Sequence, residues 1–247
     1  MRYLIIPDIH EKIDKTLDIL EQIPKKYGTD KTIFLGDIYD ILAPYDPLRT
    51  RLAARLHKRL INECIVLWGN HDIQYFYEDV KGIHSSGYHP RRTDIIFDEF
   101  GMDKITDYMN KIKFFEMLHN DNPEKRFLIS HAGVHSSFLN DYSPLWSQLH
   151  NQSMFALMAL KRGEMHQFIG AGLSVGGKQP YGGIIWLRDW EMDYIGINQI
   201  VGHTENDNVR KYPNQIGNQK FINYCIDTNL HHLAILDDEG NIEIIDI

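Results

Sequence analysis

The sequence predicts an α/β fold. Short apolar runs alternate with amphipathic helical patterns along the chain. Five of these runs are followed at once by carboxylate, amide or imidazole side chains. The carboxyl ends of strands in open α/β sheets face the crevice in which such folds bind ligands. Although a length of 247 residues would also allow two domains, we expect a single domain over residues 1–247, with its site at the strand ends.

The first expected strand, residues 3–7, leads directly to Asp8 and His10. Apolar side chains then recur at spacings of four and three between residues 13 and 23, which is the pattern of one buried helix face. Pro24 is expected to end this helix. The strand, the helix and the next strand would together form a βαβ unit.

The second expected strand, residues 32–35, leads to Asp37 and Asp40. Asp46 is expected to cap the following helix. One side of that helix has leucines four residues apart: Leu48, Leu52, Leu56 and Leu60. Its other side is rich in Arg and Lys, which we interpret as a solvated face and not as a binding patch.

The third expected strand, residues 64–68, is a continuous apolar run typical of a buried parallel strand, and it leads to Asn70 and His71. The alternation of strand and helix then lapses over residues 73–125, which we interpret as a cap insert over the site. Apolar spacing predicts a helix over residues 102–119 within it. Four side chains of the insert are either packing residues or substrate contacts: Tyr75, His89, Arg91 and Arg92.

Two later strands also end at histidines. Residues 127–129 lead to His131, and residues 199–201 lead to His203. Carboxylates and imidazoles at five strand ends are what a two-metal hydrolytic site requires, because one carboxylate must bridge the cations while oxygen and imidazole ligands complete their coordination. The sequence therefore predicts such a site.

The rest of the chain supplies support for this arrangement. A short apolar helix is expected over residues 153–161. The Gly-rich stretch 170–183 lacks the Lys-Ser/Thr of a phosphate-binding P-loop, so we expect a mobile loop near the site. The chain closes with three strands and a turn at 238–241, an antiparallel finish expected in the second sheet of a sandwich: 220–226, 233–236 and 242–247.

Composition excludes several classes of function. A formal net charge of −8 argues against broad binding to nucleic acid, which depends on clustered Lys and Arg. The apolar runs are all shorter than the roughly 20 residues of a membrane span, and residues 1–7 do not resemble a targeting segment. Cys64 and Cys225 both lie in apolar runs, which favours buried thiols in a reducing, cytoplasmic location.

The ordered set of motifs resembles the calcineurin-like metallophosphoesterases, and most of all their phosphoprotein-phosphatase branch with its phage lambda and diadenosine-tetraphosphatase relatives. The resemblance implies a four-layer α-β-β-α sandwich of two mixed sheets with flanking helices and a helical insert near the site. The motifs that carry it are Asp8-x-His10, Gly36-Asp37-x-x-Asp40, Gly69-Asn70-His71-Asp72, His131-Ala132-Gly133 and Gly202-His203-Thr204.

The same resemblance implies two divalent metal ions. We expect manganese, with iron, zinc, nickel or magnesium as alternatives. Asp8 and His10 would hold the first ion, and Asp37 would bridge both. The second ion would be completed by three more residues: Asn70, His131 and His203.

A hydroxide that bridges the two ions would attack the phosphorus, and the leaving oxygen would then need a proton. His71 is the expected acid, and Asp40 is expected to orient it and to favour its charged form. Asp40 is also compatible with a helix or turn cap, and the two roles do not exclude each other.

The sequence departs from the branch at two positions. The branch has phosphate-binding arginines where this chain has Ile41 and Trp68. Arg188 lies in a Trp-x-Arg segment similar to that of the lambda enzyme, which makes it the expected phosphate clamp, with Arg91 and Arg92 as alternatives. A surface ion pair of Arg188 with Asp189 or Asp193 is the other interpretation. Glu205 takes the place of a second histidine and is a candidate extra ligand.

Three functions stay open at this point. The first is a phosphomonoesterase of the serine/threonine protein phosphatase type, with a phosphoprotein or a small phosphate ester as substrate. The second is a hydrolase of nucleotide polyphosphates or phosphodiesters, which the missing arginines and the aromatic-rich insert favour. The third is a catalytically inactive, metal-binding regulatory protein. The retained His71 argues against the third, and the sequence does not determine the oligomeric state.

Overall fold

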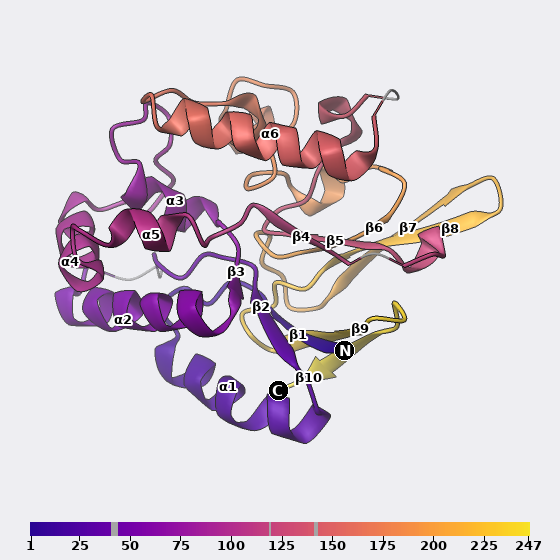
Figure 1. Cartoon of the computed structure of the whole chain (residues 1–247), viewed down its shortest axis with the longest axis horizontal. Coiled ribbons are helices and arrows are strands. Elements are labelled where there is room, and N and C mark those ends of the chain that lie inside the picture. Colours follow the sequence, from indigo (N-terminus) through magenta and orange to yellow (C-terminus); the bar gives the residue numbers. More distant parts are fainter. Residues whose placement is uncertain (41–43, 119, 141–142) are drawn as a thin grey trace.

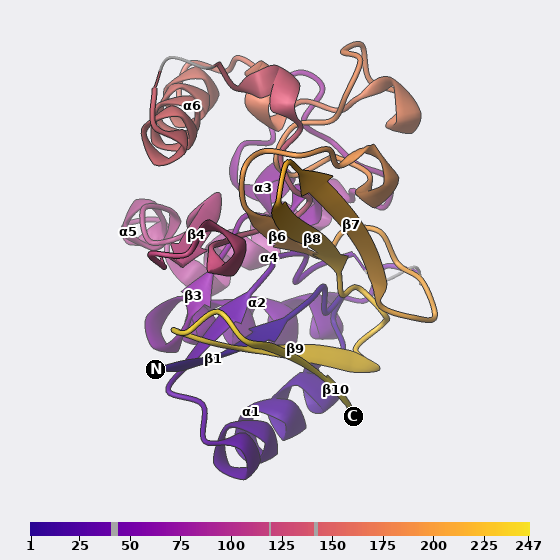
Figure 2. The ribbon, with the colours of Figure 1, turned by 90° about the vertical axis from the view of Figure 1, so that its right-hand side faces the viewer.

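Two mixed five-stranded sheets pack face to face in the computed structural model, and helices cover their outer faces (Figures 1 and 2). This arrangement confirms the predicted α/β sandwich. The structure describes residues 1–40, 44–118, 120–140 and 143–247. Ile41 and His119, which the sequence analysis used, lie outside the described residues.

The first sheet has the order β10-β9-β1-β2-β3. β1, β2 and β3 run parallel, and β9 is antiparallel to both β1 and β10. The prediction that the last three strands all join the second sheet was therefore wrong for β9 and β10, which extend the first sheet beyond β1. The bounds are β1 Arg2–Ile6, β2 Lys31–Phe34, β3 Ile65–Val66, β9 His232–Asp237 and β10 Ile242–Asp246.

The second sheet has the order β4-β5-β6-β8-β7, with a parallel centre and an antiparallel strand at each edge. The sequence analysis missed β4 and β7. β7 contains Pro213, which an edge strand tolerates because its outer N–H groups need no partner. The bounds are β4 Phe115–Leu118, β5 Phe127–Ser130, β6 Asn198–Val201, β7 Arg210–Ile216 and β8 Gln219–Cys225.

Alternation along β1 explains how the layers are joined. Leu4 and Ile6 belong to the apolar cluster that includes residues of the helices, whereas Ile5 belongs to a separate cluster between the two sheets. α1 (Ile13–Tyr27) and α2 (Pro47–Glu63) flank the first sheet, and α6 (Leu145–Leu160) lies beyond the second (Figures 1 and 2).

Three details of these helices differ from expectation. α1 continues past Pro24 and ends at Gly28, which has φ of 64° and donates its N–H to the carbonyl of Pro24. The side chain of Asp46 caps α2 as predicted, but Leu48 and Leu52 are exposed, so the leucine ladder does not mark the buried face throughout. α6 begins eight residues before the predicted residue 153, at Leu145.

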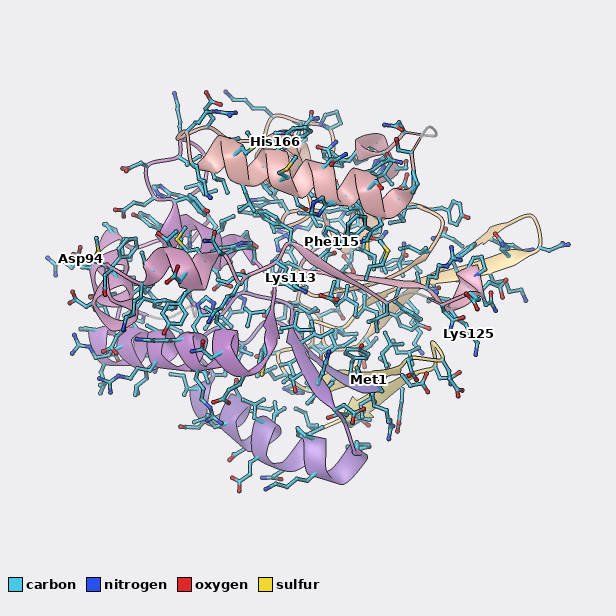
Figure 3. All side chains as sticks on the ribbon, in the orientation of Figure 1. Met1, Asp94, Lys113, Phe115, Lys125 and His166 are labelled. Atoms are coloured by element: carbon cyan, nitrogen blue, oxygen red, sulfur yellow. The ribbon has the colours of Figure 1, made fainter. Side chains whose placement is uncertain are left out.

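The helix predicted over residues 102–119 was wrong. α5 covers only Ile105–Met109, and the chain then extends to form a bridge between Lys113 and Leu67 before it enters β4. Figure 3 shows Lys113 and Phe115 on this extended segment, which lies beneath α6. A short apolar run fits either a helix or a buried strand, and pairing with β5 decides in favour of a strand here.

Two more α-helices of the described chain follow the third strand. α3 spans Asn70–Phe76, and α4 spans Pro90–Phe100 and packs against α2. α3 begins at the G-N-H-D motif, so its first turn lies at the strand ends, where the site is expected. No helix in the described part of the chain is long and apolar enough to cross a membrane.

Candidate metal centre

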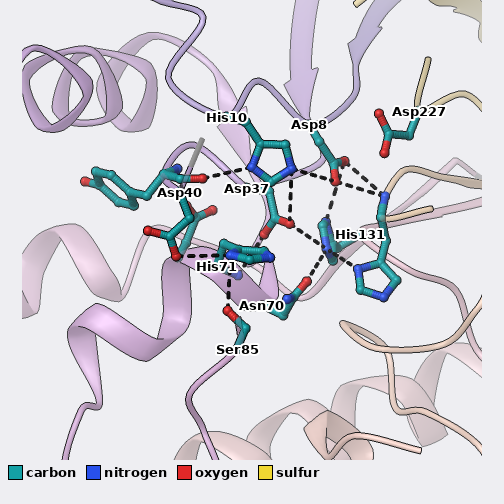
Figure 4. Close-up of polar contacts among 12 residues, drawn as sticks. Asp8, His10, Asp37, Asp40, Asn70, His71, Ser85, His131 and Asp227 are labelled. Carbon is teal, nitrogen blue, oxygen red and sulfur yellow. Dashed lines mark hydrogen bonds and ion pairs between the residues drawn. The ribbon is translucent and has the colours of Figure 1, made fainter. Parts of the chain in front are cut away.

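The six residues predicted to bind metal come together at the carboxyl ends of β1, β2, β3, β5 and β6 (Figure 4). They are contributed by five separate loops, so the sheets must be docked before the group exists. The residues are Asp8, His10, Asp37, Asn70, His131 and His203.

Two overlapping groups have ligand atoms within 4.8 Å of one another. In the first group, His10 Nε2 lies 3.9 Å from Asp8 Oδ2 and 4.0 Å from Asp37 Oδ2. In the second, His131 Nε2 lies 3.5 Å from Asp37 Oδ2 and 3.1 Å from His203 Nδ1. Asp37 is the one residue that belongs to both groups. Its carboxylate is therefore placed as a bridging ligand must be.

Asn70 completes the second group, because its Oδ1 lies 2.9 Å from His131 Nε2. The Nδ1 atom of His131 lies 2.9 Å from the carbonyl oxygen of Leu35, a contact that fixes the orientation of the ring. The carboxylate and amide oxygens beside the histidines are hard donors, and together with imidazole nitrogens they suit a divalent ion.

The backbone is left-handed at three of these residues. His10 has φ of 41°, Asp37 of 51° and His203 of 65°. Residues other than glycine adopt this conformation at a cost, so it persists where surrounding contacts enforce it. The His10 N–H donates to the carbonyl of Asp37 at 2.9 Å, and the His203 N–H donates to Asp8 Oδ1 at 3.1 Å. The ligands thus hold one another's loops in place.

Two glycines are required because ligands approach the backbone closely. A Cβ atom on Gly69 would lie 2.1 Å from Asp37 Oδ1, and one on Gly202 would lie 2.1 Å from Asp8 Oδ1. Both distances are far inside van der Waals contact. The glycines of G-N-H-D and G-H-T therefore make room for the carboxylates of two other motifs.

The electrostatics of the group fit a bound cation. Burial raises the pKa of Asp8 and of Asp37 well above the usual range, and it lowers the pKa of His131 to about 3. Asp227, Asp8 and Asp72 add like-charge repulsion to the two carboxylates. Buried anionic and neutral donors without a compensating charge are what a divalent ion would stabilise.

His71 and Asp40 form a pair beside this group. His71 Nδ1 lies 3.0 Å from Asp40 Oδ2, and the His71 N–H donates to Asp37 Oδ1 at 2.9 Å. Burial lowers the pKa of His71 to about 4 and raises that of Asp40 to about 7, although hydrogen bonds from Tyr75 and Gln74 oppose the shift of Asp40. The hydrogen bonds described for the Asp40 carboxylate are with the side chains of His71, Gln74 and Tyr75, and not with the backbone N–H groups that a cap would contact.

A family model for calcineurin-like phosphoesterases matches residues 1–233. The chain belongs to this family. It is therefore a hydrolase that acts on phosphate esters, and its Asp and His groups are able to hold metal. No match to this calcineurin-like phosphoesterase was found among proteins with curated descriptions.

Several solved structures of similar fold align with almost the whole length of this chain. One, assigned provisionally as a diadenosine tetraphosphatase, has 16% identity and a TM-score of 0.49 over 99% of this chain and 93% of its own. A Saccharomyces cerevisiae serine/threonine phosphatase similar to human PP5 has 13% identity and a TM-score of 0.49 over 100% and 80%. The E. coli phosphoesterase YfcE has 12% identity and a TM-score of 0.41 over 100% of both chains. Similarities at this level do not identify a substrate.

Sequence reasoning missed the contribution of Asp72. Its carboxylate is fully buried and accepts the N–H groups of Ile38, at 2.7 Å, and of Tyr39, at 3.4 Å. Burial raises the pKa of Asp72 to about 7. Through its two hydrogen bonds to backbone N–H groups, the Asp72 carboxylate fixes the loop that runs from Asp37 to Asp40. The sequence feature that could have identified Asp72 is its position as the last residue of the G-N-H-D motif, but the sequence analysis gave this residue no role of its own.

Two of the four insert side chains considered as substrate contacts, those of Tyr75 and Arg92, contact Asp40, the partner of His71. Tyr75 is buried and donates its hydroxyl to Asp40 Oδ1. Arg92 is buried as well, where it pairs with Glu11 and lies 3.5 Å from Asp40 Oδ1. His89 stacks on Tyr45 at 4.3 Å between ring centroids. Arg91 is the exposed member of the four residues that had been considered.

Arg188 lies close enough to His203 for its charge to lower the pKa of that histidine, after burial and His131. The proposed ion pairs with Asp189 and Asp193 are not what the structure shows. Asp189 pairs with Arg210, and Asp193 accepts the N–H of Ser136 at 2.7 Å. The guanidinium lies over the ring of Trp190 at 5.8 Å and has no carboxylate partner among the described residues. It is therefore available to a ligand.

A cavity of about 1040 Å³ lies between the loop at residues 81–86 and the Gly-rich stretch, whose predicted mobility remains a prediction. Arg188 and Trp186 are among its lining residues, together with Lys81, His84 and Lys178. Trp186 also meets His203 edge to face, with ring centroids 5.8 Å apart. The cavity therefore lies beside the metal centre, with Trp186 between them, and its lining includes two lysines.

Trp68 and Glu205, which the sequence analysis also considered, do not contribute ligand atoms to the two groups. Trp68 is fully buried and packs against Phe76 at 5.4 Å, so it replaces an arginine with a core side chain. Burial lowers the pKa of both His10 and Lys12, and the exposed Glu205 opposes that shift through its charge. Glu205 belongs to neither of the two ligand groups.

Proposed function

We propose that this phosphoesterase binds two divalent ions and hydrolyses a phosphomonoester in the manner of a serine/threonine protein phosphatase. The observation that carries the proposal is the carboxylate of Asp37, which is shared by two groups of ligand atoms. Asp8 and His10 would hold the first ion, and Asn70, His131 and His203 would hold the second. Manganese is the metal we propose to test first, with iron, zinc, nickel and magnesium as alternatives.

When bound, such ions would activate water and neutralise the phosphate oxygens. The residues of the chain supply the rest. Asp40 Oδ2 lies 3.0 Å from His71 Nδ1 and is placed to accept a hydrogen bond from its N–H, which leaves Nε2 as the nitrogen that, in the imidazolium form, would give its proton to the leaving oxygen. Arg188 is proposed to bind a phosphate oxygen through its planar guanidinium.

The second candidate is hydrolysis of a nucleotide polyphosphate or a phosphodiester. The size of the cavity, about 1040 Å³, and the presence of Lys81 and Lys178 beyond Arg188 favour it, since further phosphates would need further cations. We expect neither nucleic-acid binding, given a net charge of −8, nor a membrane partner. Cys64 and Cys225 are free thiols, which supports a cytoplasmic location.

The test uses the full chain, stripped of metal and then reconstituted with Mn²⁺. Metal content is measured by mass spectrometry, and activity is measured with p-nitrophenyl phosphate, its bis ester and diadenosine tetraphosphate. Two bound ions per chain and a preference for the monoester would support the first candidate. Preference for either of the other substrates would support the second, and a single bound ion would contradict the dinuclear site.

A further inference from the structure

The loop at residues 81–86 forms one wall of the large cavity and also reaches the acid pair. Ser85 is half-buried in this loop and lines the cavity. Its Oγ lies 3.1 Å from His71 Nδ1, the nitrogen that also faces Asp40 (Figure 4). A residue on the substrate side of the cavity is therefore in direct contact with the proposed acid.

Gln74 fixes Ser85 in this position. The Oε1 atom of Gln74 accepts both the Ser85 N–H, at 2.7 Å, and the Ser85 hydroxyl, at 3.0 Å. The Nε2 atom of the same amide donates to Asp40 Oδ2 and to the carbonyl of His71, at 3.2 Å in the second case. Gln74 is fully buried, and these contacts use both hydrogens and both lone pairs of its amide.

The direction of each hydrogen bond follows from this arrangement. The Ser85 hydroxyl has two carbonyl-type acceptors, Gln74 Oε1 at 3.0 Å and the more distant Ser86 carbonyl at 3.4 Å, and donation to either leaves an oxygen lone pair to face His71 Nδ1. The Nδ1–H group then has two acceptors, Asp40 Oδ2 at 3.0 Å and Ser85 Oγ at 3.1 Å. Two acceptors on different elements define the plane of the imidazole ring better than the carboxylate alone.

We propose that Ser85 is a positioning residue for His71, and that it links the orientation of this acid to the filling of the cavity. The inference rests on the function proposed above, in which His71 protonates the leaving oxygen. A substrate that packs against Lys81 or His84 holds the loop, and Ser85 with it, against the imidazole ring. A substrate too small to reach that wall leaves the loop held by Gln74 alone, so that Ser85 and the ring are less restricted.

The first test compares Ser85→Ala with Ser174→Ala in the full chain with Mn²⁺. Ser174 is an exposed serine outside the cavity lining, so its variant deletes the same hydroxyl without touching His71. The two substrates are phosphoserine and a phosphoserine peptide, which share one leaving oxygen and differ in how much of the cavity they fill. We expect Ser85→Ala to lower kcat for the peptide by about 3–10-fold, with a smaller effect on phosphoserine.

Two comparisons distinguish positioning from a general structural effect. The loss should shrink for p-nitrophenyl phosphate, whose leaving group needs little protonation, and Ser85→Thr should restore kcat because it keeps the hydroxyl. Equal losses for all three substrates, or a loss of the same size in Ser174→Ala, would overturn the inference. A change confined to KM would overturn it too, since it would make Ser85 a contact for binding alone.

A second measurement does not depend on turnover. The ¹⁵N resonance of His71 Nδ1, and the exchange of its proton with water, are recorded for the wild type and for Ser85→Ala. We expect a shifted resonance and faster exchange in the variant. If the wild type hydrolyses none of the substrates but the resonance shifts, the proposed function fails while the contact stands. An unchanged resonance would refute the positioning role whatever the activity.

Discussion

The two halves of the metal centre are built in different ways. The first half takes Asp8 and His10 from a single loop after β1, and the side chain of His10 is 23% exposed. The second half takes His131 and His203 from loops after β5 and β6, and the side chain of His131 is 0% exposed. One half is local to a single loop, whereas the other is assembled from two strands, and each half combines a buried ligand with one partly exposed histidine, His10 or His203.

This difference indicates how the halves should respond to perturbation. The first half takes both of its own ligands from one loop, so a change within that loop should affect it alone. The second half includes His131, a fully buried residue that cannot move without disturbing the core. Asp37 belongs to both halves, so its substitution should affect both of them together. Substitutions at the other ligands should affect one half more than the other.

Asp37→Asn should have the largest effect. A neutral amide cannot bridge two dications as a carboxylate does, so both halves should lose affinity for metal and hydrolysis should fall to the background rate. Metal content and kcat are measured after reconstitution with Mn²⁺. Retention of both ions with normal turnover would remove the basis of the dinuclear proposal.

His71→Asn should leave both halves occupied and still lower kcat by ~10²–10⁴-fold, because it removes the proposed proton donor. The loss should be smallest for p-nitrophenyl phosphate. Metal content serves as the control here. An equal loss for nitrophenyl and alkyl leaving groups would show that His71 positions the substrate instead.

His10→Ala and His131→Ala form a matched pair that tests the comparison itself. His10→Ala should weaken the first half and be rescued by excess Mn²⁺, since the loss of a partly exposed ring leaves the core undisturbed. His131→Ala removes a fully buried ring and leaves a cavity, so we expect the free energy of unfolding to fall by about 2–4 kcal/mol and the melting temperature to fall with it. Excess metal should rescue this variant poorly. Identical metal titrations and melting curves for the two variants would contradict the distinction.

Arg188→Ala should leave both halves intact and lower kcat/KM by about 10–100-fold, as expected for the loss of a charged hydrogen bond to phosphate. Lysine at this position should rescue only in part, because it lacks the planar fork. Wild-type kinetics in Arg188→Ala would direct the search to Lys81, Lys178 and Arg91, since Arg92 is buried against Glu11.

The smallest expected effect is a dependence of metal affinity on pH. Burial raises the pKa of Asp8 and Asp37, so both hold protons in the metal-free protein where free carboxyl groups would be ionised. Folding alone is thus less favourable as pH rises above the unfolded value, whereas metal binding becomes more favourable because fewer protons must be released. Calorimetry with Mn²⁺ in buffers of different ionisation enthalpy should show proton release, and no release would contradict the raised pKa values.

The sequence predicted the part of the site that strand ends dictate. Asp8, Asp37 and His131 each follow an apolar run, and parallel strands bring such ends to one edge. It did not predict β4, because the run at 112–118 fits a helix until its partner β5 is known. It also missed the contacts of Asp72 and Ser85, since hydrogen bonds to a backbone loop and to a distant imidazole leave no periodic signal.

The hydrogen bond from the His203 N–H to Asp8 joins residues that are 195 positions apart. Closing so long a loop costs entropy that only late, non-local contacts repay. This amide should therefore become protected from hydrogen exchange only after the sheets have docked, and it should open only in events that separate them. Its exchange rate would serve as a reporter of global unfolding, and bound metal would slow it more than it slows amides at the free edge of β7.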